Sequence, residues 1–102
     1  TNKFNFHGLK EIVDQLKEKP VYFTLDLDVL DPSVFPGTGT PEAGGVSFQE
    51  LLEAMIQVSH LNIVGFDVNE LSPVYDQSGS STAMACKVLR ELLIAVMKNR
   101  AE

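Results

Sequence analysis

The chain has 102 residues, enough for one domain or part of one, with a modest hydrophobic core. Its formal net charge is −6 and its sequence pI is about 4.8. An acidic chain repels phosphate backbones, so we expect no nucleic-acid partner, whereas a metal ion or a small cationic ligand would be attracted.

The cysteine content and the hydropathy of the chain predict a cytoplasmic protein. Cys86 is the single cysteine, so no disulfide can form within the chain, as in a reducing cytosol. It lies among apolar residues at helical spacing, which predicts a small core residue. No apolar run approaches about 18 residues, so no membrane partner is expected. The chain begins with Thr1 rather than Met, which suggests processing, a truncation or a chain break.

The first half of the chain predicts a helix, a strand and a long loop. Apolar residues at helical spacing predict a helix over residues 7–18, and a β-branched and aromatic run predicts a strand over 21–27. The loop at 28–45 contains three prolines and four glycines and has no periodic pattern. A loop of this length inside a compact domain is usually functional.

The second half repeats the order of helix and strand and ends in a helix. Ser47 and Glu50 form a capping-box pattern, which predicts the start of a helix there. The expected apolar stripe of this helix consists of Leu51, Leu52, Met55, Ile56 and Val58. A strand is predicted over residues 62–68 and a final helix over about 80–98.

Strands that alternate with helices predict an α/β fold, with a parallel sheet and helices on both faces. Two strands are too few for a stable parallel sheet with both faces covered. We therefore expect this sheet to pair with strands from another segment or another chain.

Two aspartates lie at the end of the first predicted strand. Residues two apart in a strand point to the same side, so Asp26 and Asp28 are expected to project together from the carboxyl end of the sheet, where ligands bind in open α/β folds. Adjacent carboxylates repel unless a cation lies between them, and Mg²⁺, Ca²⁺ and Mn²⁺ prefer oxygen ligands. The alternative is a pair of aspartates that cap backbone N–H groups of the loop.

Other acidic residues have different expected roles. Asp31 precedes Pro32, a turn-starting pair, which predicts a structural role. Glu70 follows the second strand and could bind a cationic group of a substrate in the same cleft, or be a solvated loop residue. Asp67 alternates with apolar neighbours and is expected to be either an apical residue or a packing-side residue of that strand.

The hydroxyls and histidines give weaker signals. Thr38 and Thr40 belong to the sequence GTGTP, where they could orient a substrate or, as we favour, satisfy the backbone of the loop. His7 and His60 have no partner at metal-ligand spacing, so both are expected to be structural.

Two segments resemble the signatures of the ureohydrolase family, which includes arginase, agmatinase, guanidinobutyrase and formiminoglutamase. The run FTLDLDVLDPSVFPGTGTPEAGG is similar to the family pattern S-x-D-x-D-x-x-D-P, followed by a P-x-T-G-T-P loop and paired glycines. Thr24 takes the place of the serine and keeps the hydroxyl. The segment GFDVNELSP is similar to the family's G-x-D-x-x-E-x-x-P strand end. The resemblance covers roughly residues 20–98.

The resemblance implies an arginase-like three-layer α/β/α fold and a role for each matching residue. It implies that Asp26 bridges two Mn²⁺ ions, that Asp28 binds one of them, and that Glu70, as a catalytic residue, pairs with the substrate guanidinium. It also implies that Thr40 lies beside this small cationic guanidino substrate. The implied reaction is attack of a metal-activated hydroxide on the guanidinium carbon, which releases urea and an amine.

The segments PGTGTPE and PVYDQSG resemble bacterial agmatinases more than arginases. The resemblance therefore implies hydrolysis of agmatine to putrescine and urea, with arginase or another guanidino-hydrolase as the alternative. By analogy with the family, a homo-oligomer, either a trimer or a hexamer, is expected.

The family's G-G-D-H and D-A-H-x-D motifs, which supply two histidines and two further aspartates, are absent from this sequence. Residues 1–102 therefore resemble the C-terminal portion of a ureohydrolase domain, and the remainder of the same enzyme is an expected partner. The isolated chain is expected to be inactive and to be poorly folded or aggregated; the alternative is a soluble but inactive oligomer.

Two further hypotheses belong to other classes. A non-catalytic structural or binding module of the same fold is disfavoured because two strands leave unpaired edges. A haloacid-dehalogenase-like phosphatase also ends a strand in D-x-D, but that motif opens its domain, and the GTGTP loop has no place in it.

Overall fold

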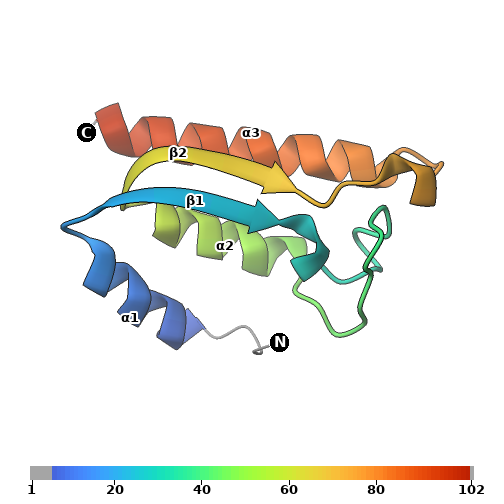
Figure 1. Cartoon of the computed structure of the whole chain (residues 1–102), viewed down its shortest axis with the longest axis horizontal. Helices are drawn as coiled ribbons and strands as arrows, with labels where there is room; N and C mark the ends of the chain where they lie inside the picture. Colours follow the sequence, from blue (N-terminus) through green and yellow to red (C-terminus); the bar gives the residue numbers. More distant parts are fainter. Residues whose placement is uncertain (1–5, 102) are drawn as a thin grey trace.

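The computed structural model describes residues 6–101, with side chains from residue 8 onward. The helices are α1 (Phe6–Leu16), α2 (Phe48–Ser59) and α3 (Ser80–Ala101), and the strands are β1 (Pro20–Asp26) and β2 (Asn62–Asn69). Short 3-10 turns, η1 (Leu27–Val29) and η2 (Pro73–Tyr75), follow the two strands. The predicted α-β-α-β-α order is confirmed (Figure 1).

The two strands pair in parallel, which confirms the predicted α/β class. Thr24 lies opposite Asp67, and Asp26 lies opposite Asn69 at the carboxyl end of both strands. Within residues 6–101 the sheet consists of these two strands alone, so each strand has one unpaired edge.

Burial alternates along β1 and separates the two faces of the sheet. Phe23 and Leu25 point inward, whereas Tyr22, Thr24 and Asp26 are exposed on the other face. The inward face packs against the helices, with both strands in front of α2 and α3 in Figure 1. In the described part of the chain, the helices therefore cover one face of the sheet.

The start of α2 depends on the predicted capping box. The Ser47 hydroxyl accepts the Glu50 N–H at 3.1 Å, and the Glu50 carboxylate accepts the Ser47 N–H at 3.0 Å. These bonds satisfy two N–H groups that the first turn would otherwise leave free. The helix buries Leu51, Ala54, Met55 and Val58. Ile56 was expected in this stripe but is exposed, because it lies about 100° around the helix from Met55.

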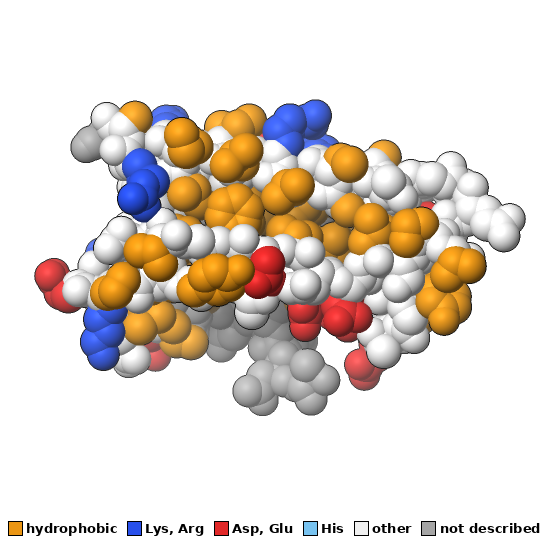
Figure 2. Space-filling model, turned by 45° about the horizontal axis from the view of Figure 1, so that its top comes forward, with side chains coloured by type: hydrophobic (Ala, Val, Ile, Leu, Met, Phe, Trp, Pro, Cys, Tyr) orange, Lys and Arg blue, Asp and Glu red, His pale blue; other side chains and the backbone are white. Residues whose placement is uncertain are grey.

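The apolar surface of α3 is wider than the part of it that is buried against the rest of the chain. Its residues Val88, Leu92 and Val96 are buried at four-residue spacing. Its large exposed apolar residues are Leu89, Leu93, Ile94 and Met97, and Figure 2 shows a band of hydrophobic side chains along this helix and the strands. Cys86 is exposed, so its expected place in the core is wrong: it lies two residues before Val88, on a different side of the helix. Among residues 6–101, none of the helices has the length and apolarity needed to cross a membrane.

The long loop after β1 is closed at its base by backbone hydrogen bonds. The Asp31 N–H donates to the Val46 carbonyl, and the Val46 N–H donates to the Val29 carbonyl, both at 2.9 Å. Leu30, Phe35 and Val46 are buried in the core beneath the loop. The ends of the loop are thus fixed to the same place, and its tip projects at the carboxyl end of β1.

Gly45 is expected to be essential for closing this loop. A Cβ at Gly45 would lie 2.6 Å from Asp31 N and 2.7 Å from Val29 O, both backbone atoms that cannot rotate away. The substitution Gly45→Ala should therefore lower the free energy of unfolding by about 1–3 kcal/mol, the usual cost of overpacking. Urea unfolding of the full-length protein that contains this chain measures the change.

The matched control is Gly39→Ala in the same loop. A Cβ there would make only an ordinary contact, 3.7 Å from a ring carbon of Tyr75. Equal unfolding midpoints for the two variants would contradict the role given to Gly45.

Candidate metal and substrate site

Asp26 and Asp28 line one cavity, although only Asp26 belongs to the strand. β1 ends at Asp26, and Asp28 lies in the 3-10 turn η1, so the alternation of a strand does not apply to it. The expectation that both side chains project from the strand is therefore wrong for Asp28. The turn nevertheless brings Asp28 to the same cavity as Asp26.

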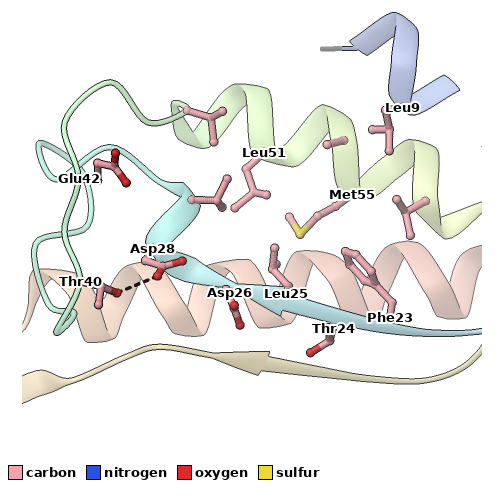
Figure 3. Close-up of a pocket in the computed structure, with 14 residues that line it drawn as sticks. Leu9, Phe23, Thr24, Leu25, Asp26, Asp28, Thr40, Glu42, Leu51 and Met55 are labelled. Atoms are coloured by element: carbon pink, nitrogen blue, oxygen red, sulfur yellow. Dashed lines mark hydrogen bonds between the residues drawn. The ribbon is translucent and has the colours of Figure 1, made fainter. Parts of the chain in front are cut away.

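This cavity has a volume of about 550 Å³ and lies along β1, beside α1 and α2. Its wall is mostly apolar, with Leu9, Phe23, Leu25, Leu51 and Met55 among the lining residues. At one end, the cavity borders the polar residues Asp26, Asp28, Thr40 and Glu42. Figure 3 shows Phe23 and Leu25 pointing toward α2, whereas Thr24 and Asp26 point to the opposite side of β1.

A direct hydrogen bond joins the loop tip to Asp28. The Thr40 hydroxyl donates to Asp28 Oδ2 at 2.8 Å (Figure 3). The Thr38 hydroxyl is buried and accepts the Thr40 N–H at 3.5 Å. Thr38 thus satisfies the backbone of the loop, as favoured for both threonines, whereas the Thr40 hydroxyl orients a carboxylate, a role that was not expected.

The structure does not favour the capping alternative for the aspartate pair. Asp26 occupies the N-cap position of η1, but its side chain makes no capping hydrogen bond. Asp28 accepts a side-chain hydroxyl rather than a backbone N–H. Asp26 is exposed and Asp28 is half-buried, so both carboxylates are available to a ligand.

Glu70 lies directly after β2 but does not line the cavity of Asp26 and Asp28. Its predicted place in the same cleft is therefore not reproduced in the described structure. The reason is local: Glu70 has φ 78°, and this left-handed conformation turns the chain immediately after the strand. Non-glycine residues held in this region often belong to functional sites.

The Asp31 carboxylate accepts four hydrogen bonds from loop residues, which confirms its predicted structural role. Its Oδ2 accepts the Ser33 hydroxyl at 2.5 Å and the Ser33 N–H at 3.0 Å. Its Oδ1 accepts the N–H groups of Gly44 and Gly45 at 3.0 and 3.2 Å. The hydrogen bonds from Ser33, followed by those from the glycines, lower the pKa of the Asp31 carboxyl.

Asp67 belongs to a polar cluster on the exposed face of the sheet, so the packing-side alternative for this residue is wrong. The hydroxyls of Thr24 and Tyr22 donate to its carboxylate, the latter at 2.9 Å, and the Asn69 amide also donates to it. The Thr24 hydroxyl is the main cause of the lowered pKa of Asp67. Thr24 faces Asp67 in the parallel register, which places both side chains on the face opposite to the helices.

The two histidines do not contribute to this site. His60 ends α2 at the opposite end of the sheet from Asp26, where its N–H donates to carbonyls of the last helical turn. The side chain of His7 lies outside the described residues.

The donor chemistry of the pair fits part of a manganese site. Carboxylate oxygens suit Mn²⁺, and Asp26 and Asp28 offer them near the carboxyl end of β1, with the Asp26 side chain on the side of the strand away from α2. No cluster of three or more histidine, cysteine or acidic side chains that could ligate a metal occurs among the described residues. Any further ligands would have to come from outside residues 6–101.

The sequence model described as the arginase family matches residues 3–95. The chain belongs to the arginase family. An agmatinase of Bacillus anthracis is 47% identical over 92 residues, which are 88% of this chain and 32% of that protein. The mitochondrial guanidino acid hydrolase of Homo sapiens is 42% identical, over 86% of this chain and 25% of its own.

Solved structures agree with this assignment. The proclavaminate amidinohydrolase of Streptomyces clavuligerus superposes with a TM-score of 0.77 at 39% identity, covering 89% of this chain and 32% of that one. This arginase-family chain thus spans about a third or less of the length of these relatives.

Sequence reasoning missed a network next to the site. Gly37, in the loop that carries Thr40, donates its N–H to the buried Ser81 hydroxyl, and Ser81 is held by Asp76. The signal was present in DQSGSS, an aspartate followed by serines before a helix, which is typical of side-chain capping. What the sequence could not show is the partner of this network, because Gly37 lies 44 residues before Ser81.

Asp31 and Asp26, at the two ends of the segment 26–31, are expected to differ in how their truncation to alanine changes the stability of the protein. In metal-free protein, Asp31→Ala should lower the urea midpoint of unfolding, because it leaves the N–H groups of Gly44 and Gly45 without their acceptor. Asp26→Ala should not lower it, because no capping bond of Asp26 is lost. The comparison requires chelated, full-length protein, and a larger loss for Asp26→Ala would exclude the division into structural and ligand-binding aspartates.

Proposed function

We propose that the protein containing this chain hydrolyses a guanidino compound, most specifically agmatine to putrescine and urea, with two Mn²⁺ ions. The single observation that carries the proposal is the pair Asp26 and Asp28 at the carboxyl end of β1, where both residues border one cavity and the Thr40 hydroxyl orients Asp28. Membership in the arginase family supports the same reaction class.

Asp26 and Asp28 would bind the manganese ions together with ligands from outside the described residues. A bound metal pair would lower the pKa of a water molecule and so supply the nucleophile. The Thr40 hydroxyl donates to one oxygen of Asp28, which fixes the rotation of that carboxylate and directs its remaining lone pairs. Asp26 and Asp28 also supply negative charge that would attract a cationic substrate to this end of the cavity.

Glu70 would hold the guanidinium group of the substrate. A carboxylate and a guanidinium can form paired, charge-assisted hydrogen bonds, which orient the planar cation. The parallel register brings the end of β2 to the same edge of the sheet as Asp26, so Glu70 follows directly after the strand end that faces the aspartate. Its φ of 78° shows that this position is held in an uncommon conformation.

The choice of agmatine rests on the names of relatives. The Bacillus anthracis protein at 47% identity is named an agmatinase, whereas relatives at 42% are named guanidino acid hydrolase and proclavaminate amidinohydrolase. Urea release from agmatine, arginine and 4-guanidinobutyrate by the full-length protein with Mn²⁺ tests the assignment. A preference for a guanidino acid would replace agmatinase activity with guanidino acid hydrolysis and keep the reaction class.

The assembly and the location of the full-length protein are also proposals. We propose a homo-oligomer, a trimer or a hexamer, in the cytoplasm, and mass measurement of the native full-length protein tests the first point. The human relative carries a mitochondrial name, so the location of this protein is a point of its own.

Removing either ligand charge is expected to abolish metal-dependent activity. In the full-length enzyme, Asp26→Asn or Asp28→Asn should weaken Mn²⁺ binding and reduce urea release by about a hundred-fold or more, because replacing a ligand exceeds the 10–100-fold effect of altering an outer partner. Metal analysis after dialysis and a urea assay measure the two effects. Asp14→Asn, at an exposed position on α1, is the matched control. Stoichiometric Mn²⁺ with near-normal turnover in either site variant would show that the assignment is wrong.

Glu70→Gln is expected to separate substrate binding from metal binding. The amide keeps the size of the side chain but loses the charge that complements guanidinium. A hydrogen bond to a charged group contributes about 1.5–3 kcal/mol, so kcat/KM should fall about ten- to a hundred-fold, with a higher KM and unchanged Mn²⁺ content. Steady-state kinetics with metal analysis provide the measurement.

The control for Glu70 is Glu53→Gln, which changes an exposed glutamate on α2. It should leave both kinetics and metal content unchanged. Loss of metal with unchanged KM in Glu70→Gln would assign Glu70 to the metal ligands instead.

A further inference from the structure

A hydrogen-bonded network joins the loop that carries Thr40 to the loop that follows Glu70. Its members, which we call the Gly37 anchor, are Gly37, Ser72, Asp76 and Ser81. The Gly37 N–H donates to Ser81 Oγ at 2.8 Å, and the Ser72 N–H donates to the Gly37 carbonyl at 2.7 Å. Thr40 lies three residues after Gly37, and Glu70 lies two residues before Ser72. Thr40 and Glu70, the two candidate substrate-binding residues, are therefore both close in sequence to members of the Gly37 anchor.

Asp76 determines which way the Ser81 hydroxyl points. A serine hydroxyl has one proton, and Ser81 donates it to Asp76 Oδ2 at 2.6 Å. The same oxygen accepts the Ser81 N–H at 2.9 Å, while Asp76 Oδ1 accepts the hydroxyl of Ser78 at 2.5 Å. The lone pairs of the Ser81 oxygen are thus left for the Gly37 N–H, and the carboxylate polarises the hydroxyl that accepts it.

The centre of the anchor, formed by Gly37 and Ser81, is buried and closely packed. Ser81 is 0% exposed and Thr38, next to Gly37, is 2% exposed. A Cβ on Gly37 would lie 2.6 Å from Ser81 Cβ, so only glycine permits the loop to approach α3 this closely. Without the Ser81 hydroxyl, the Gly37 N–H would lose its acceptor in a place that water does not reach freely, which is costly.

We propose that Ser81 and Asp76 are positioning residues of the hydrolytic site, which act through Gly37 to hold Thr40 against Asp28 and to keep the Glu70 loop at the same end of the sheet. The inference rests on the proposed function. It assigns the first turn of α3 a role in the site, although neither residue lines the cavity. The connection runs through named bonds: Asp76 to Ser81, Ser81 to Gly37, then three residues along the loop to Thr40 and Asp28.

The experiment compares Ser81→Ala, Asp76→Asn and the control Ser80→Ala in the full-length protein. Ser80 is an exposed neighbour in the same helical turn. Hydrogen exchange of peptides covering residues 36–42 and 70–73 should become faster in both anchor variants and remain unchanged in the control. Mn²⁺ affinity, measured by titration of the metal alone, should fall about ten- to a hundred-fold, as for other partners that orient a metal ligand. The milder Asp76→Asn variant keeps the test valid if Ser81→Ala fails to fold.

A double-mutant cycle distinguishes positioning from general stabilisation. If Ser81 acts through Thr40, Ser81→Ala should reduce kcat/KM much less in a Thr40→Val background than in the parent protein. Additive effects, unchanged exchange at residues 36–42, or faster exchange with normal Mn²⁺ affinity and turnover would each overturn the proposal. If the parent protein releases no urea from any guanidino compound, the proposed function fails, while the exchange and metal titrations still decide the role of the anchor.

Discussion

Asp26 lies opposite Asn69 because β1 and β2 pair in parallel. This register brings the carboxyl ends of both strands, and the loops that follow them, to one edge of the sheet. Both strands run toward that edge, so both long loops begin there. The pairing itself depends on the inward side chains of the strands, which pack with α2 and α3 in one core. A shift of the strand pairing by one residue would turn Phe23 and Leu25 to the open face of the sheet. It would also separate the residues of the candidate site.

Three aspartates within six residues have three different environments, and the backbone decides which is which. Asp26 ends a strand and makes no capping bond, so its carboxylate is open to a ligand. Asp28 lies in a 3-10 turn and is oriented by Thr40. Asp31 accepts four hydrogen bonds within the loop, which occupies it structurally and lowers its pKa. All three residues carry the same carboxylate, and the local backbone geometry decides whether it is open to a ligand, oriented by a hydroxyl or used to hold the loop.

The surface of the described chain is consistent with its span of about a third of its relatives' length. Each strand has an unpaired edge, and Tyr22 is 62% exposed on the face that no helix of residues 6–101 covers. Unpaired edges and exposed apolar side chains favour association with further strands or helices. The same association could supply the metal ligands that are absent from residues 6–101, because β1 borders the cavity of Asp26 and Asp28.

The sequence by itself determined the order of elements, the parallel α/β class, the capping box of α2, the structural role of Asp31 and the family. These follow from local patterns, since periodicity, caps and turns involve residues a few positions apart. Only the tertiary structure decided that Asp28 leaves the strand, that Asp67 belongs to an exposed polar cluster, that Cys86 is exposed and that Glu70 does not line the cavity. It alone joined Gly37 to Ser81 across 44 residues, because contacts between distant segments depend on how the helices and loops pack, and no local pattern encodes that.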